Sequence, residues 1–205
     1  LPSFGAAPLG QRPADITGSP NYAAGKFKNL EVTHMLQPGT FWQMLQHSLF
    51  GDEQRVPTHA IPVVRRTRAD YQTPAASGLR ATWIGHATTL VELEGRRVLF
   101  DPMFSERCSP VSFAGPKRFF PPPLPLVELP HIDIVAVSHD HYDHLDMESI
   151  RALAAQGAEF VVPLGMGAHL QRWGVKLARI NELDWYDTAT IAGLRLLATP
   201  ARHYS

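Results

Sequence analysis

One short stretch decides how this chain folds, and it is rich in histidine: Ser138-His139-Asp140-His141-Tyr142-Asp143-His144-Leu145-Asp146. It follows residues 132–137, which are apolar apart from Asp133 and are typical of a largely buried strand. It precedes residues 147–156, which we expect to form a helix that Asp146 caps and Gly157 ends. Because α/β folds place their sites in the loops at strand ends, we expect this loop to carry the functional site.

The residue types in this loop favour metal binding. His139 and His141 can point to the same side of so tight a loop, and Asp143 and His144 can turn back toward them. Imidazole nitrogens and carboxylate oxygens bind Zn²⁺ at about 2.0–2.2 Å, and a donor set without thiolate suits a hydrolytic metal better than a structural zinc. A solvated polar turn is the alternative, but it does not explain three histidines and an aspartate together.

The segments around the loop predict an α/β protein with a mixed sheet and helices packed on it. Before the loop, strands are expected at 81–84, 88–93 and 97–101. After it, we expect a strand at 159–162, a helix at 166–173, a strand at 175–180 and a hairpin that begins at 191 and ends at 199. The stretch 102–130 is proline-rich and cannot be a central strand, and loops of this length are usually functional.

Residues 1–79 form a different part of the chain, an extended arm with one amphipathic helix at about 40–50. Thr40 and Gln43 fit a capping box at the start of that helix. Its apolar positions are Phe41, Trp42, Met44, Leu45 and Leu49. We expect this face to pack on the core, and a face turned toward lipid is the alternative.

The amino-acid composition excludes several classes of function. The 205 residues carry 19 Lys and Arg and 19 Asp and Glu, so no net charge attracts nucleic acid, and none is expected as a partner. Cys108 is the single cysteine, which excludes an intramolecular disulfide and a cysteine-rich zinc cluster. The chain starts without methionine and ends just after an apolar, strand-like run, so we expect both ends to be cut.

The His-x-His-x-Asp-His pattern resembles the metallo-β-lactamase-fold hydrolases. A series of further motifs, spread over residues 19–205, is similar to one branch, the N-acylphosphatidylethanolamine-hydrolysing phospholipases D and their bacterial relatives. These motifs are Gly85-His86-Ala87-Thr88, Asp101-Pro102-Met103-Phe104-Ser105, Gly115-Pro116-Lys117-Arg118-Phe119, Val162-Pro163-Leu164-Gly165 and Glu182-Leu183-Asp184-Trp185. The chain departs from the branch at Asp140, where the phospholipase has Asn.

The resemblance implies an αββα four-layer sandwich, of which residues 80–205 hold about the first half, truncated at the C-terminus. It implies two zinc ions, with iron or manganese as alternatives. The first would be bound by His139, His141 and His203, and the second by Asp143 and His144, which would also position a metal-bridged hydroxide. Asp101 would brace the metal loop from behind, with a simple turn-starting aspartate as the alternative.

Four further residues are candidates for contact with substrate: His86, Lys117, Arg118 and Tyr142. His86 could equally be structural, and Lys117 with Arg118 could be a solvated basic pair. The remaining histidines lack ligand spacing, and we expect surface or core roles for His34, His47, His59, His131 and His169.

By resemblance, the activity is a phospholipase D-like hydrolysis of an (N-acyl)phosphatidylethanolamine-type phospholipid. Two alternatives stay open: a hydrolase of the same fold that cleaves a lactone or a soluble phosphodiester, and a non-catalytic binding protein. A membrane surface and an oligomer are compatible partners. The location stays unknown, with membrane association favoured, in the bacterial cell envelope or the cytoplasm.

Overall fold

The computed structural model describes residues 1–31, 39–52 and 54–203, apart from the side chains of residues 48 and 49. The main helices are α1 (Arg12–Gly18), α2 (Thr40–Phe50), α3 (Met147–Ala155) and α4 (Gly167–Arg172), and there are short 3₁₀ turns at Pro2–Phe4, Arg68–Tyr71, Leu126–Glu128 and Leu177–Arg179. The strands are β1 (Tyr22–Ala23), β2 (Lys26–Phe27), β3 (Leu79–Gly85), β4 (Thr88–Leu93), β5 (Arg96–Phe100), β6 (Ile134–Ala136), β7 (Glu159–Pro163), β8 (Ile180–Leu183), β9 (Thr188–Ile191) and β10 (Leu194–Leu197).

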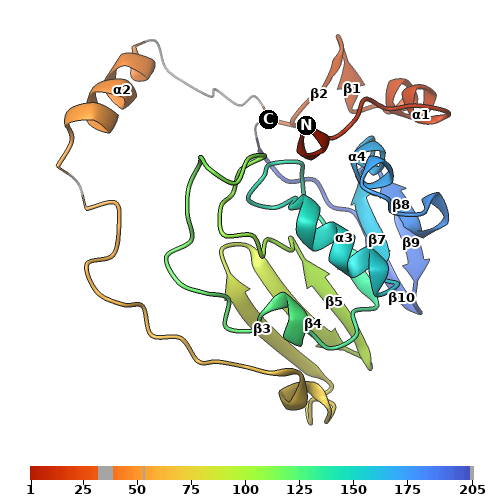
Figure 1. Ribbon diagram of the computed structural model, residues 1–205. Coiled ribbons are helices and arrows are strands. Elements are labelled where there is room, and N and C mark those ends of the chain that lie inside the picture. The colour runs from red at the N-terminus through yellow and green to blue at the C-terminus, as the bar shows by residue number, and fades with distance from the viewer. Residues whose placement is uncertain (32–38, 53, 204–205) are drawn as a thin grey trace.

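Six strands form one mixed sheet in the order β3-β4-β5-β6-β7-β8. β3, β4 and β5 are antiparallel neighbours, and β5 through β8 run parallel. Glu94 and Gly95 make the tight β4–β5 turn, both with positive φ, which matches the twist of a hairpin. The predicted α/β class with a mixed sheet is therefore confirmed (Figure 1).

The main core lies between this sheet and α3 and α4 (Figure 1). Leu99, Val135 and Phe160 come from neighbouring strands and are fully buried. Ile150 and Leu153 of α3 and Leu170 of α4 pack against them. Since side chains of a strand alternate between the two faces of a sheet, the next residues along these strands face the other way.

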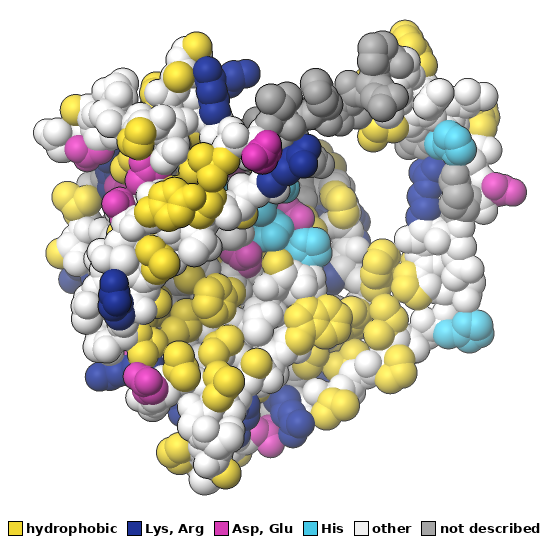
Figure 2. All heavy atoms as spheres, turned by 180° about the vertical axis from the view of Figure 1, so that it is seen from behind, with side chains coloured by type: hydrophobic (Ala, Val, Ile, Leu, Met, Phe, Trp, Pro, Cys, Tyr) yellow, Lys and Arg dark blue, Asp and Glu magenta, His cyan; other side chains and the backbone are white. Residues whose placement is uncertain are grey.

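The β9–β10 hairpin packs on that other face, where Ile191 and Leu194 meet Val98 and Ile134. It does not reach the antiparallel end of the sheet. There the apolar side chains stay between 39% and 60% exposed at Leu79, Trp83, Leu93 and Phe100. Seen from behind, apolar side chains spread over a large part of the surface (Figure 2).

The N-terminal arm is more structured than its glycine and proline content predicted, because polar residues fasten it to α4 and β8. The Arg12 guanidinium of α1 forms a buried ion pair with Glu182 of β8 and donates to Gln171. Ser19 and Asn21 both donate to the carboxylate of Asp184, at 2.5 and 3.0 Å. Such long-range pairings are not visible in a local sequence pattern.

The expectation that α2 packs on the core is wrong. The helix spans Thr40–Phe50, as the periodicity predicted, but it lies away from the sheet, across an open gap (Figures 1 and 2). Phe41 and Trp42 are 61% and 70% exposed. The expected capping box is also absent, because Gly39 is the N-cap and Thr40 is already helical.

Two strands differ most from the expectation. Residues 177–179 form a 3₁₀ turn, and the strand expected at 175–180 is found at Ile180–Leu183. The alternation of Val175 and Leu177 imitates a strand, but Val175 is buried in the core beyond α4 and Leu177 is exposed. The strand expected at 132–137 is confined to Ile134–Ala136.

Candidate metal centre

The histidine-rich loop leaves the carboxyl end of β6 and folds back on itself before α3. Its turn is closed by the amide nitrogens of His144 and Leu145, which both donate to the carbonyl of His141, at 2.9 and 2.8 Å. Leu145 is buried in the core and anchors the turn. This local fold returns His144 toward the start of the loop, as the sequence predicted.

Three histidines meet in a first cluster: His139, His141 and His203. The Nε2 atoms of His139 and His203 each lie 3.1 Å from Nδ1 of His141. One ligand atom from each of the three residues lies within 4.8 Å of the others. The structure thus brings together the three residues expected at the first ion, although His203 is 62 positions from His141 in the chain.

A second cluster lies next to the first and consists of His86, Asp143 and His144. His86 Nε2 lies 2.8 Å from Asp143 Oδ2, and His144 Nε2 lies 3.6 Å from the same oxygen. The rings of His139 and His144 are 4.0 Å apart between centroids, so the two clusters are contiguous. Histidine and acidic side chains are visible together in a hollow of the surface in Figure 2.

Asp101 lies directly behind both clusters, where the sequence placed a brace. Its carboxylate accepts hydrogen bonds from the amide and the hydroxyl of Ser138, at 2.7 and 2.8 Å, and contacts Nδ1 of His144 at 2.9 Å. The Ser138 hydroxyl in turn lies 2.9 Å from Nδ1 of His139. Each of the two imidazoles, His139 and His144, is therefore held through its Nδ1 atom. This leaves the Nε2 atom of each ring facing the centre.

The electrostatics of the clusters suit metal binding. The pKa of His139 is lowered to about 4, because burial disfavours the imidazolium and because His144, His203 and His141 would add like charge. Burial raises the pKa of Asp143, but its backbone hydrogen bond, His144 and His86 outweigh burial and lower it. At neutral pH the imidazole of His139 is uncharged and can bind a cation through Nε2, and Asp143 carries a negative charge.

His86 reaches Asp143 through an unusual backbone. Its φ is +50°, in the left-handed region that a residue with a side chain rarely adopts, and it follows Gly85 at the end of β3. The indole nitrogen of Trp83 donates to the carbonyl of His86 at 2.8 Å and fixes this turn. Strained backbones of this kind are concentrated at functional sites.

Two residues that hold the site were not predicted as site residues. The side-chain Nδ2 of Asn29 donates to the backbone carbonyl of His203 at 2.5 Å. The side-chain Oδ1 of Asn29 accepts from the backbone nitrogen of His203 at 3.2 Å. The N-terminal arm thus holds the last histidine of the first cluster. Ser138 is the other, and its position beside the first histidine was the available signal; nothing local marks Asn29.

Asp146 occupies the N-cap position of α3, as predicted, but its carboxylate makes no capping hydrogen bond to the helix backbone. It accepts from the amide and hydroxyl of Ser105, at 3.1 and 2.8 Å, and so ties the start of the long loop to the metal loop. The hydroxyl of Ser149 donates to the same carboxylate.

The other expected site residues lie around this centre. Lys117 pairs with Glu106 at 2.6 Å on the surface, and Arg118 donates to the carbonyls of Ser105 and Met103. Tyr142 is half-buried within the metal loop. Their contact with substrate stays a prediction.

Among the described residues, the remaining histidines and the cysteine take no part in these clusters. His169 accepts from the amide of Ala6, and burial lowers its pKa. Burial likewise raises the pKa of Cys108. His34 lies outside the described residues.

A mixed sheet with helices on one face and a histidine- and aspartate-rich loop at its strand ends defines a class of metal-dependent hydrolases. The family model described as "Beta-lactamase superfamily domain" matches residues 96–205, more than half of the chain. The chain belongs to the beta-lactamase superfamily.

Several curated proteins are similar to this chain. It is 43% identical to an uncharacterized protein of Mycobacterium tuberculosis over 91% of this chain and 50% of that protein. It is 37% identical to N-acyl-phosphatidylethanolamine-hydrolyzing phospholipase D 1 of Caenorhabditis elegans, over 77% of this chain and 46% of that protein. The chain thus spans about half the length of these relatives.

The solved structures that this chain matches include a metallo hydrolase from Ignicoccus hospitalis. It is 21% identical, with a TM-score of 0.46 over 61% of this chain and 49% of that one. A diiron β-hydroxylase from Streptomyces venezuelae is 23% identical, with the same TM-score over 60% of this chain and 24% of that one.

Proposed function

We propose that this chain supplies the metal-binding loop of a two-zinc phosphodiesterase that hydrolyses phospholipids of the N-acylphosphatidylethanolamine type. The observation that carries the proposal is the contiguity of two three-residue donor groups in one hollow. The 37% identity to the Caenorhabditis elegans phospholipase D supports the substrate class.

The donor chemistry fits two divalent transition-metal ions. His139, His141 and His203 would hold the first, and Asp143 and His144 the second, with His86 beside them. Nitrogen donors with one carboxylate and no thiolate suit zinc in a hydrolytic role. When bound, such a pair lowers the pKa of water toward neutrality and neutralises charge on phosphoryl oxygens.

The chain's own residues keep these donors in place. Asp101 and Ser138 orient His139 and His144, and Asn29 holds the backbone of His203. The phosphorus–oxygen bond on the head-group side would break when water attacks phosphorus, which leaves phosphatidic acid and releases the N-acylethanolamine. A membrane surface would present this substrate; among the described residues no helix combines the length and apolarity that crossing a bilayer requires.

A hydrolase of another bond is the second candidate. The chain is also 31% identical to a UPF0173 metal-dependent hydrolase of Methanopyrus kandleri, over 62% of this chain. That similarity supports metal-dependent hydrolysis and does not specify the bond that is cleaved.

An assay panel separates the candidates. The whole protein, purified without chelator, is given N-acylphosphatidylethanolamine in mixed micelles, a soluble phosphodiester and a lactone. We expect release of N-acylethanolamine, loss of activity with chelator and recovery with Zn²⁺. Turnover of the lactone or the soluble diester with none of the lipid would favour the second candidate.

A matched pair of variants ties the activity to the site. His144→Ala should lower turnover by on the order of a hundredfold or more, since even residues that only orient metal ligands contribute 10–100-fold. His131→Ala, an exposed histidine away from both clusters, should keep it. Equal turnover by both variants would contradict the assignment of the site.

A further inference from the structure

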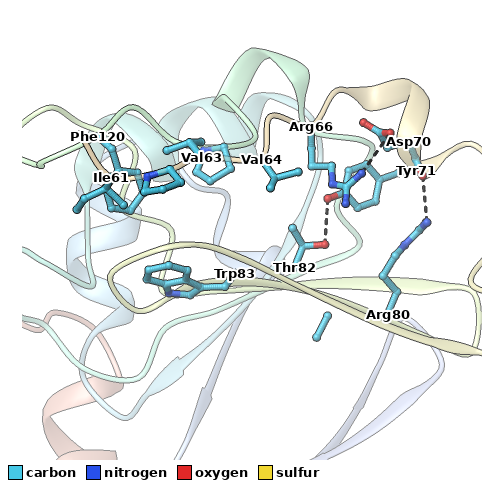
Figure 3. A pocket seen from close by; sticks show the side chains of 13 residues that line it. Ile61, Val63, Val64, Arg66, Asp70, Tyr71, Arg80, Thr82, Trp83 and Phe120 are labelled. Carbon is cyan, nitrogen blue, oxygen red and sulfur yellow. Dashed lines mark hydrogen bonds and ion pairs between the residues drawn. The ribbon is translucent and has the colours of Figure 1, made fainter. Parts of the chain in front are cut away.

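A groove of about 500 Å³ lies along the free edge of the sheet, beside the metal centre. Its floor is β3, the edge strand, from Arg80 to Trp83, which corresponds to about 10 Å of strand. The opposite wall is formed by residues 61–64 of the arm and by Phe120 (Figure 3).

The wall of the groove is fastened to the body at several points. The amide of Arg66 donates to the carbonyl of Pro123 at 2.8 Å, next to the residues of the wall. The Arg68 side chain donates to the carbonyls of Leu129 and Val127, at 3.1 and 2.8 Å. Tyr71 is buried, and its hydroxyl donates to Thr82 of the floor at 3.0 Å. The groove is therefore built into the fold.

The two ends of the groove differ in polarity. Ile61, Val63 and Val64 face Trp83 and Phe120 at one end (Figure 3). At the other end the charged groups are paired, Arg66 with Asp70 at 3.8 Å and Arg80 with Glu92. A groove lined in this way suits an uncharged, linear, apolar ligand better than an anion.

At the apolar end, Trp83 connects the groove to the second cluster. The rings of Trp83 and Phe120 are 6.1 Å apart between centroids. Phe120 packs against Gly85, where an added Cβ would lie 3.4 Å from the ring. Trp83 donates to the carbonyl of His86, the residue that contacts Asp143. The apolar end of the groove therefore adjoins His86 of the second cluster.

We propose that the groove between β3 and residues 61–64 binds one acyl chain of the phospholipid substrate. The inference rests on the proposed function. The chain would lie along Trp83 and Phe120 and against Val63 and Val64, and it would stop at the Arg66–Asp70 pair. The contact between Trp83 of the groove and His86 of the second cluster, together with the paired state of the groove's charges, supports an acyl chain over an anionic ligand.

Quenching by bromine tests occupancy without any need for turnover. The zinc-loaded whole protein is mixed with N-acylphosphatidylethanolamine that carries dibrominated acyl chains, and with the unbrominated lipid as reference. We expect bromine to quench part of the tryptophan emission, and Trp83→Phe to remove at least half of that quenching. Trp185→Phe, outside the groove, should keep it. Equal quenching in both variants would overturn the proposal.

A second pair of variants tests the effect on substrate preference. Val64→Glu introduces a charge into the groove, and Val127→Glu introduces the same charge at an equally exposed valine elsewhere. The ratio of kcat/KM for long-chain to short-chain substrate should fall at least tenfold in Val64→Glu and stay within twofold in Val127→Glu. An unchanged ratio in Val64→Glu, as expected if a peptide paired with the edge strand instead, would overturn the proposal. If no variant hydrolyses any phospholipid, the proposed function fails, and the quenching still decides whether the groove binds the chain.

Discussion

Asp101 holds the metal loop at both of its ends, because one carboxylate binds Ser138 at the start and His144 near the finish. The backbone of Asp101 is in the left-handed region, with φ at +43°. The hydroxyl of Thr88 donates to the backbone carbonyl of Asp101 at 2.7 Å. Both the backbone conformation and the carboxylate of Asp101 therefore restrict which residue can occupy this position.

Asp101→Asn should weaken metal binding without removing a donor atom of either cluster. Asn has one carboxamide oxygen, and the NH2 group in place of the second oxygen cannot accept, so His144 and the Ser138–His139 contact lose their orientation. We expect the affinity for Zn²⁺ to fall about 10–100-fold, measured by competition with a chelating dye. Asp15→Asn, on the exposed side of α1, serves as control. A change below twofold in Asp101→Asn would show that the loop orients itself.

Glu92 gives the fold a defined pH dependence. Burial raises its pKa, but the hydrogen bonds from Arg80 and Arg97 outweigh burial and lower it below the ordinary 4.5. The ion pairs therefore stabilise the fold fully above pH 4.5, and this contribution is lost as the pH falls through the lowered value. Glu92→Gln should cost about 3 kcal/mol at pH 7 in urea unfolding. The difference from the unchanged protein should shrink at pH 3.5, and a constant difference would contradict this account.

The sequence was most informative about residues that act locally. Four of the five expected metal-binding residues lie within six positions, so their convergence follows from the turn itself. His203 could be expected only by resemblance. The roles of Asn29 and His86 depend on contacts made 174 and 57 positions away, which no local pattern encodes.

Among the elements, α2 differs most from its prediction. Helical periodicity predicts that a segment has an apolar side, and it does not specify what that side contacts. The strand expected at 175–180 fails for a related reason, since a buried Val175 next to a turn imitates alternation. The other elements that form or contact the central sheet were predicted within a few residues.

The exposure of α2 leads to a prediction about stability. Trp42→Gln should change the free energy of unfolding by less than about 0.5 kcal/mol, because an exposed side chain makes little packing contribution. Phe160→Ala, in the core, should cost about 3–5 kcal/mol. Denaturant melts of the two variants provide the comparison. A cost above about 2 kcal/mol for Trp42→Gln would mean that α2 packs on the core.

At the scale of the molecule, the sheet is covered unequally. One face is buried by α3 and α4, while on the other the β9–β10 hairpin leaves Leu79, Trp83, Leu93 and Phe100 partly exposed. Exposed apolar surfaces of this kind mark interaction sites or promote aggregation. The αββα sandwich expected by resemblance would cover such a face with a second sheet.

A protein of residues 1–205 alone should therefore bind a dye for apolar surfaces and self-associate. We expect enhanced fluorescence of anilinonaphthalene sulfonate and a scattering mass that rises with concentration. Phe100→Thr, which makes the exposed face less apolar and introduces a β-branched residue that strands favour, should reduce both. A monodisperse protein that leaves the dye unchanged would show that the face is adequately covered.

The metal content of the whole protein tests whether the two clusters bind one ion each. After purification without chelator, elemental analysis should find close to two equivalents of a transition metal. The double variant His139→Ala, His141→Ala should lose at least the first ion, and the exposed control His131→Ala should keep both. Retention of both ions by the double variant would contradict the assignment of the metal centre.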